Sequence, residues 1–230
     1  MWLQRSYTVP KVGDVPNEDR FASSDRTFAL SDGASISYDS ALWAQIICTH
    51  YIDCQHITPE WVSACAAEFN TQHQHSALPW YKEEALARGS FASLLGVQVA
   101  ENEIQIAAIG DSIAVLCDGT VRKDTFPYRN PEQFEQAPLL LSTVPTKNPF
   151  FSDGGLAEDY VCRWPLEGLQ TPRLFCMTDA LGLWLLSSEE ADPISRLLAL
   201  DSEESFADFV VAEREAGRLR RDDTTLLVLW

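Results

Sequence analysis

The sequence predicts an α+β fold of antiparallel sheets flanked by helices, formed by one domain that spans residues 1–230. Of its 230 residues, 46% are hydrophobic and 10% are aromatic, so the chain can bury a sizeable core. Segments with the period of strands are grouped together along the chain, and so are segments with the period of helices. Such grouping is typical of antiparallel α+β domains, and two sheets with helices outside them would fit. The sequence does not fix the order of the strands.

The N-terminal part of the chain is predicted to hold one strand and two helices. Residues 27–31 form a short apolar strand that ends at Asp32. Residues 39–53 carry apolar side chains at helical spacing, and residues 59–74 form a second helix with Thr58 as its N-cap.

From residue 90 the period of the sequence changes to that of strands. Strands are expected at residues 91–100, 104–109, 114–117 and 120–122. Asp118-Gly119 is a strong hairpin signal, so these strands are predicted to form an antiparallel meander. Residues 124–160 are rich in Pro, Asn and Gly, and we expect loop there with short helical pieces.

The last part of the chain is predicted to contain two strands with two helices between them. The strands are at residues 173–178 and 225–229, and the helices are at 188–200 and 202–216. Ser188 and Ser202 mark the helix starts, because each is followed by glutamates that suit the first turn.

The net charge of the chain argues against a nucleic-acid binder. Asp and Glu total 34 against 17 Lys and Arg, which gives a formal net charge of −17. A protein that binds nucleic acid needs a basic face to neutralise phosphates. The one dense basic run contains Arg218, Arg220 and Arg221, and two aspartates follow it directly. An acidic surface usually serves solubility, whereas acidic side chains that converge at one point require a cation.

The sequence also gives expectations about location and redox state. No stretch approaches the roughly 20 apolar residues of a membrane span, and the first residues lack the apolar run of a signal peptide. We therefore expect a cytoplasmic protein without membrane contacts. The six cysteines have no C-x-x-C spacing, so reduced and mostly buried thiols are expected.

Aspartates recur where predicted strands begin or end. The four places are Asn17-Glu18-Asp19, Ser31-Asp32-Gly33, Thr178-Asp179-Ala180 and Asp222-Asp223-Thr224. Strand ends hold side chains rigidly, as a cation site requires, and Mg²⁺ and Mn²⁺ prefer oxygen ligands. Gly33 lets the backbone approach closely, so its carbonyl could also be a ligand. Each place alone is a weak signal, since Asp-Gly is a common turn.

The order of these places resembles the motif series of the PPM/PP2C phosphatases. The series is Asn17-Glu18-Asp19, Leu30-Ser31-Asp32-Gly33, Gly89-Ser90-Phe91-Ala92, Ile109-Gly110-Asp111-Ser112, Thr178-Asp179-Ala180-Leu181 and Asp222-Asp223-Thr224-Thr225. The resemblance covers residues 17–230 and is similar to the compact bacterial branch of the family. It implies a β-sandwich of two mainly antiparallel sheets in α-β-β-α layers, with metal ions at one end.

The resemblance also implies roles for residues of this chain. Two Mg²⁺ or Mn²⁺ ions would be held by Asp32, Gly33, Asp179, Asp222, Asp19 and Glu18. Asp32 would bridge the two ions, and the Gly33 carbonyl would bind one of them. Asp19 and Glu18 would act directly or through water. A water between the ions is the nucleophile in that family, which makes Asp32 and Asp19 the catalytic side chains.

The resemblance further implies a metal-dependent phosphatase that hydrolyses phosphoserine and phosphothreonine on proteins. The partner would be a phosphorylated protein, the product of a cognate Ser/Thr kinase, although a small phosphorylated metabolite stays open. Residues 124–160 lie where such enzymes carry a variable flap near the site, and we expect this segment to set specificity.

The sequence departs from the family pattern at three points. An arginine that binds the substrate phosphate is replaced by Asp14, and Lys11, Arg5 or Arg20 would have to substitute. Lysine provides a point charge and not a bidentate fork. A third metal in some members uses the equivalent of Asp111 and a second aspartate; Leu183 stands at the second position. Asp111 is thus either a ligand of a weak third site or a turn residue. Ala180 replaces a usual glycine.

Other hydrolase chemistries fit the sequence less well. The run from Cys117 to Arg122 is one residue short of a cysteine-phosphatase loop, and its acidic neighbour would raise the pKa of the thiol. The sequence has no G-x-S-x-G motif, and all its histidines lie in the predicted helical region. His73 and His75 are two residues apart, which puts them on different helix faces and argues against zinc.

A non-enzymatic relative is the serious alternative. It would keep the fold but bind a phosphoprotein or a partner domain without hydrolysing it. The missing arginine favours this interpretation, whereas the complete set Asp19, Asp32, Asp179 and Asp222 favours an enzyme. Four mutually repelling carboxylates are costly to keep unless a cation offsets their charge.

Overall fold

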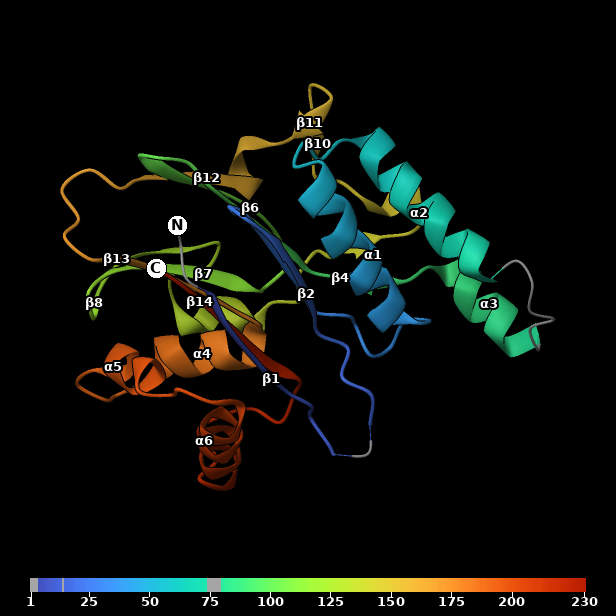
Figure 1. Ribbon diagram of the computed structural model, residues 1–230. Coiled ribbons are helices and arrows are strands. Elements are labelled where there is room, and N and C mark those ends of the chain that lie inside the picture. The colour runs from blue at the N-terminus through green and yellow to red at the C-terminus, as the bar shows by residue number, and fades with distance from the viewer. Residues whose placement is uncertain (1–3, 14, 74–79) are drawn as a thin grey trace.

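Two five-stranded antiparallel sheets lie face to face, with helices on both outer sides (Figure 1). The computed structural model describes residues 4–13, 15–73 and 80–230. The first sheet has the order β1 (Gln4–Val9), β14 (Thr224–Leu229), β13 (Pro172–Met177), β7 (Ile113–Asp118) and β8 (Val121–Phe126). The second has the order β12 (Val161–Pro165), β6 (Glu103–Ile109), β5 (Leu94–Val99), β3 (Thr27–Ser31) and β2 (Arg20–Ser24). The expected α+β sandwich is confirmed.

In the described part of the chain, helices lie on the outer side of each sheet. The second sheet carries α1 (Ser40–Asp53) and α2 (Pro59–His73), with α3 (Trp80–Arg88) beside α2 at the edge of the molecule (Figure 1). The first sheet carries α4 (Asp179–Ser187), α5 (Pro193–Leu198) and α6 (Glu203–Glu215). None of the helices in the described ranges is long and apolar enough to cross a membrane.

The predicted loop region of residues 124–160 contains only short elements. Its strands are β9 (Leu141–Ser142), β10 (Phe151–Ser152) and β11 (Gly155–Leu156), and its 3₁₀ turns are η1 (Pro131–Glu135), η2 (Pro145–Lys147) and η3 (Glu158–Tyr160). β9 pairs with β4 (Phe91–Ala92), which precedes β5, and this pairing fixes the middle of the segment.

Apolar side chains form three layers of core. The layer between the sheets includes Leu30 and Leu95 from the second sheet and Leu174 and Leu227 from the first, each at most 1% exposed. The other two layers lie between each sheet and its helices. Burial of this area is the main favourable term in folding. The inner strands β7 and β14 are covered on both faces, so their sequences are nearly continuous apolar runs.

The predicted meander is wrong in one respect: its strands belong to two different sheets. β5 and β6 pair within the second sheet, whereas β7 and β8 pair within the first. The chain crosses between the sheets at Gly110, whose φ is +102°. A Cβ there would lie 2.6 Å from the Ser93 Cβ, so glycine is required for this crossing. The predicted strand 91–100 is likewise broken at Ser93.

The helix predicted at residues 188–200 is also wrong in its extent. α5 begins at Pro193, because the Asp192 side chain caps it by accepting a hydrogen bond from the Ser195 N–H at 2.9 Å. The sequence analysis missed α4, which follows directly after β13 and is too apolar on all sides to show helical periodicity. The helices at 39–53, 59–74 and 202–216 are confirmed to within one residue at their described ends.

A fully buried glutamate joins α6 to the segments beside it. The Glu213 side chain is 0% exposed and accepts hydrogen bonds from Trp184 Nε1 at 2.9 Å, Arg196 Nη2 at 2.6 Å and Arg218 Nε at 2.7 Å. The Arg218 bond is the largest cause that lowers the pKa of Glu213 to about 2. The buried charge is thus satisfied by two cations and an indole.

We expect Glu213→Gln to lower the free energy of unfolding near neutral pH by about 3 kcal/mol, because two arginines lose their buried anionic partner. The ordinary pKa is 4.5, so the ionised Glu213 stabilises the fold above that pH. Its contribution is lost as the pH falls from about 4.5 towards 2. Urea unfolding between pH 7 and pH 3 measures this loss.

The matched control is Glu215→Gln, an exposed position on the same helix. This variant should retain the stability of the wild type within about 0.5 kcal/mol. Equal stability of the two variants at pH 7 would show that the Glu213 charge does not support the fold.

Candidate metal centre

Four aspartates from distant segments line one cavity at an end of the sandwich. The cavity has a volume of about 140 Å³, and its acidic wall consists of Asp32, Asp111, Asp179 and Asp222. Asp32 follows β3, Asp111 lies in the crossing between the sheets, Asp179 begins α4 and Asp222 precedes β14. Gly33, Ala34, Ser35, Pro138 and Leu140 complete the lining. The structure therefore brings together side chains up to 190 positions apart in sequence.

The turn after β3 is fixed by backbone contacts on both sides. The Asp32 N–H donates to Ser93 Oγ at 2.9 Å, and the Ser93 N–H donates to the Asp32 carbonyl at 2.8 Å. A Cβ on Gly33 would lie 2.8 Å from the backbone carbonyl of Ser40, the first residue of α1. Only glycine permits this close approach, which places Asp32 at the cavity.

Asp19 is buried against the first sheet and leaves one oxygen without a partner. Its side chain is 5% exposed, and Oδ2 accepts hydrogen bonds from Thr225 Oγ1 at 2.6 Å and Thr178 Oγ1 at 3.1 Å. Oδ1 is buried without a hydrogen-bond partner among the described residues. Burial, as the largest cause, raises the pKa of Asp19 to about 7. An unpartnered buried carboxylate oxygen is what a bound cation would satisfy.

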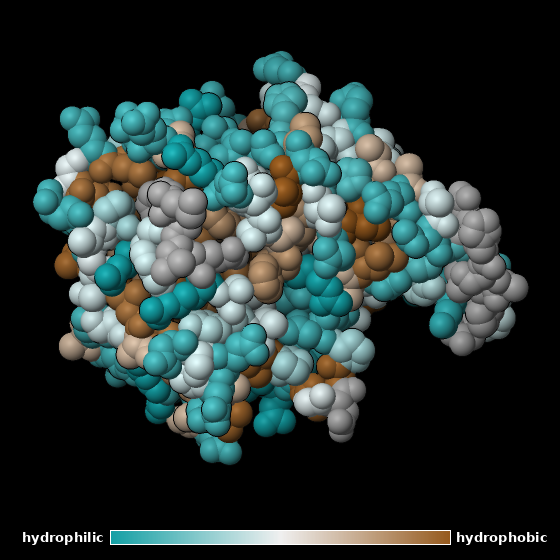
Figure 2. Space-filling view, viewed as in Figure 1, coloured by the Kyte–Doolittle hydropathy of each residue, from teal (hydrophilic) through white to brown (hydrophobic). Residues whose placement is uncertain are grey.

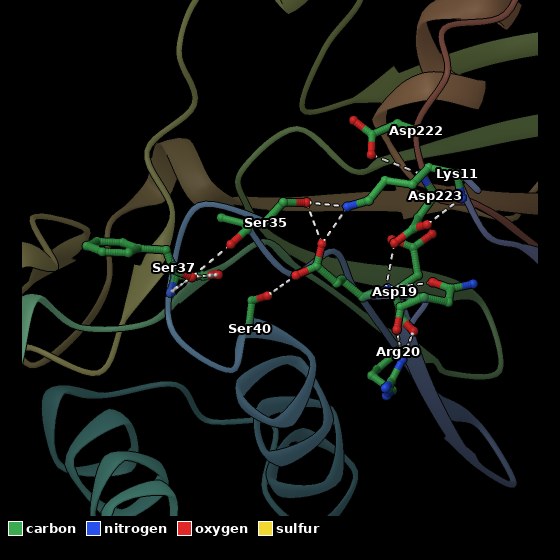
Figure 3. Close-up of polar contacts among 12 residues, drawn as sticks. Lys11, Asp19, Arg20, Ser35, Ser37, Ser40, Asp222 and Asp223 are labelled. Atoms are coloured by element: carbon green, nitrogen blue, oxygen red, sulfur yellow. Dashed lines mark hydrogen bonds and ion pairs between the residues drawn. The ribbon is translucent and has the colours of Figure 1, made fainter. Parts of the chain in front are cut away.

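Glu18 accepts hydrogen bonds from three side chains, those of Lys11, Ser35 and Ser40, which are labelled in Figure 3. It accepts hydrogen bonds from Lys11 Nζ at 2.7 Å, from Ser40 Oγ at 2.5 Å and from the Ser35 hydroxyl. Lys11 Nζ also contacts Ser35 Oγ at 2.5 Å. Burial opposes ionisation of Glu18, but these hydrogen bonds outweigh it and lower its pKa. Glu18 is thus already satisfied by protein groups, unlike Asp19.

Asp223 ties the N-terminal loop to the last strand (Figure 3). Its side chain is 2% exposed, and its two oxygens accept the Lys11 N–H and the Glu18 N–H, each at 2.6 Å. These hydrogen bonds set the position of the loop that carries Glu18 and Asp19. The two adjacent aspartates therefore have separate tasks: Asp222 faces the cavity and Asp223 supports it.

Asp179 forms an ion pair with the side chain of Arg220. Arg220 Nη2 forms an ion pair with Asp179 Oδ2, while Asp179 Oδ1 is buried without a hydrogen-bond partner among the described residues. Burial raises the pKa of Asp111, and the positive charge of Arg220 partly opposes this effect.

Burial and neighbouring carboxylates both disfavour ionisation of Asp32 at the cavity. Burial is the largest cause that raises the pKa of Asp32 well above its ordinary value, and the nearby charges of Asp19, Asp111 and Asp222 raise it further. Burial also raises the pKa of Asp111. At about 4 Å, a like-charge pair costs about 1–4 kcal/mol, depending on the local dielectric. A divalent cation would change the sign of that interaction.

The donor set fits hard divalent cations. It consists of carboxylate oxygens, two of them buried and unpartnered, which are ligands that Mg²⁺ and Mn²⁺ prefer. As the side chains stand in the described part of the chain, no three His, Cys, Asp or Glu groups are gathered closely enough to hold one ion.

The residues suggested as substitutes for the family arginine are occupied elsewhere. Lys11 Nζ is bound to Glu18 and Ser35, and Arg20 Nη1 donates to the carbonyls of Asn17 and Asp19, each at 2.7 Å. Arg5 donates to carbonyls near α5. Asp14 and His75 lie outside the described residues.

The sequence analysis missed the supporting and cationic residues of the site. Thr178 and Thr225 stood beside the quoted aspartates, but nothing in the sequence showed that their hydroxyls converge on Asp19. Arg220 was noted only as part of a basic run. Its position two residues before Asp222 was the one available signal of its place at the cavity.

Solved structures of similar architecture include phosphatases. The chain is similar to the Mycobacterium tuberculosis serine/threonine phosphatase PstP/Ppp, with a TM-score of 0.65 and 13% identity over 99% of this chain and 97% of that one. The chain has the PP2C-type phosphatase fold. The phosphatase Stp1 from Staphylococcus aureus matches this fold with a TM-score of 0.59 and 14% identity, over 100% of this chain and 94% of that one.

A manganese-bound phosphatase also shares the PP2C-type fold. The catalytic domain of PstP in complex with two manganese ions matches with a TM-score of 0.59 and 14% identity, over 99% of this chain and 97% of that one. Neither a family model nor a curated protein matches the sequence significantly.

We expect Asp223→Ala to lower the free energy of unfolding by about 2–4 kcal/mol, because two buried N–H groups lose a charged acceptor. Asp222→Ala should change it by less than about 1 kcal/mol, because Asp222 adds repulsion at the cavity and supports little else. Urea unfolding of both variants without metal measures the difference. If both variants unfold at the same urea concentration, the separate tasks assigned to the two aspartates are wrong.

Proposed function

We propose that this protein is a metal-dependent phosphatase that removes phosphate from phosphoserine and phosphothreonine on proteins. The observation that carries the proposal is the cavity of about 140 Å³, lined by four aspartates, at the end of a PP2C-type sandwich. Its partner would be a phosphoprotein in the cytoplasm, the product of a Ser/Thr kinase.

The proposed ligands of two Mg²⁺ or Mn²⁺ ions are Asp32, Gly33, Asp179, Asp222, Asp19 and Glu18. When bound, the ions would supply positive charge for the phosphate oxygens and lower the pKa of water for an in-line displacement. Asp32 would bridge the two ions from its fixed turn. Asp19 would use its free Oδ1, since the two threonine hydroxyls hold Oδ2 in place.

The remaining residues position this set. Asp223 holds the loop of Glu18 and Asp19, and Ser93 holds the backbone of Asp32. Glu18, already bound by Lys11 and two serines, is suited to contact through water rather than direct ligation. Asp111 lies in the cavity wall, so it is a proposed ligand of a third, weaker site. Pro138 and Leu140 bring the 124–160 segment to the cavity, where it could set specificity.

One observation favours the alternative of a binding module without catalysis. The carboxylates of Asp179 and Glu18 are neutralised by Arg220 and Lys11, so part of the acidic set is satisfied without metal. Such a protein would bind a phosphorylated partner through the same face. It would bind Mn²⁺ weakly, and it would show no turnover.

We expect wild-type protein to hydrolyse p-nitrophenyl phosphate and a phosphothreonine peptide with Mn²⁺ and to lose this activity with EDTA. Asp32→Asn should reduce kcat by at least about 100-fold, because the ligand that joins both ions loses its charge. Mn²⁺ affinity, measured by electron paramagnetic resonance, should fall in parallel.

Asp208→Asn is the matched control, with the same loss of charge at an exposed position on α6. It should keep wild-type activity and Mn²⁺ affinity. Equal, metal-independent background rates in the wild type and in Asp32→Asn would reject the enzyme and leave the binding module.

A further inference from the structure

An acidic cavity that accepts a phosphate monoester needs a fixed cation besides its metals. The chain carries a net charge of −17, and Figure 2 shows one hydrophilic face with only scattered apolar areas. Phosphate recognition depends on charge-assisted hydrogen bonds, for which the planar guanidinium of arginine is well suited. Asp14 stands where the family has its arginine, and Lys11 and Arg20 are bound to protein groups.

Arg220 meets the geometric requirements. Its Nη2 is paired with Asp179, a residue of the cavity wall, and its charge acts on Asp111 in the same wall. The Arg220 side chain is 42% exposed, so the guanidinium is open to solvent. In the described part of the chain, Asp179 is the one hydrogen-bond partner of the guanidinium, and Nη1 and Nε stay available to an incoming anion.

The position of Arg220 is set by a tight turn. The Asp222 N–H donates to the Arg220 carbonyl at 3.0 Å, so this arginine and the proposed metal ligand belong to one short loop. Leu219, the residue before Arg220, is 4% exposed and lies in the core beneath α6, where it anchors the start of the loop. The loop thus places Asp222 in the cavity wall and Arg220 beside Asp179, another residue of that wall.

We propose that Arg220 is the residue that binds the phosphate of the substrate. Asp179 keeps its guanidinium at the cavity mouth, and the free NH groups bind the phosphate oxygens there. The Arg220 guanidinium supplies the positive charge for the phosphate that Asp14 cannot supply. This inference rests on the proposed function for its substrate, but phosphate binding can be measured without hydrolysis.

The test compares Arg220→Ala and Arg220→Lys with Arg221→Ala. Arg221 is the exposed neighbour, and it offers the same loss of charge one residue away. For Arg220→Ala, the KM for p-nitrophenyl phosphate and the inhibition constant of inorganic phosphate should each rise at least about tenfold, because charged hydrogen bonds are lost. Arg220→Lys should recover part of this loss, and Arg221→Ala should resemble the wild type.

Two measurements without turnover complete the test: calorimetric binding of inorganic phosphate to Mn²⁺-loaded protein, and Mn²⁺ affinity by electron paramagnetic resonance. If the wild type binds phosphate without hydrolysing esters, and Arg220→Ala does not bind it, the inference stands although the proposed enzyme fails. If Arg220→Ala leaves phosphate binding unchanged and only tightens Mn²⁺ binding, the inference is overturned. Arg220 would then be an internal cation that competes with metal for Asp179. Unchanged phosphate and Mn²⁺ binding in Arg220→Ala would also overturn it.

Discussion

Electrostatic repulsion among buried carboxylates is the constraint on which this structure depends. Asp32, Asp111 and Asp222 line one cavity at the end of the sandwich, and burial raises the pKa of Asp32 and of the neighbouring Asp19. The strands that carry these aspartates are held by the core between the sheets, which includes Leu30, Leu174 and Leu227. The fold thus brings carboxylates that repel one another to one cavity, and a divalent cation would offset their repulsion.

The carboxylates that support the site differ from those that form it in their hydrogen bonds. Asp223 and Glu213 are buried but fully satisfied, by two backbone N–H groups in one case and by two arginines and an indole in the other. Asp19 and Asp179 each keep one buried oxygen without a partner in the described part of the chain. Satisfied buried charges stabilise a fold, whereas unsatisfied ones at a cavity mark a place for a ligand.

The sequence predicted the main elements and the aspartates, but not the contacts between them. Helical and strand periods are local, so α1, α2, α6 and β3 could be read with accurate ends. The apolar α4 has no polar face and therefore no period. The change of sheet at Gly110 depends on close packing against Ser93, which no local pattern encodes. For the same reason, the threonine hydroxyls on Asp19 and the pairing of Arg220 with Asp179 could be found only in the folded chain.

The balance of charge at the cavity favours the enzyme over the binding module. Arg220 neutralises one carboxylate, Asp179, and Lys11 neutralises Glu18 at the rim. Asp32 gains no such partner among the described residues, and the nearby aspartates all disfavour its ionisation. A module that only binds a phosphoprotein would gain stability and anion affinity from an asparagine at Asp32, because that change removes repulsion towards phosphate. An ionised Asp32 is useful only when a cation lies between it and the phosphate, and this arrangement is the one that a metal-dependent phosphatase requires.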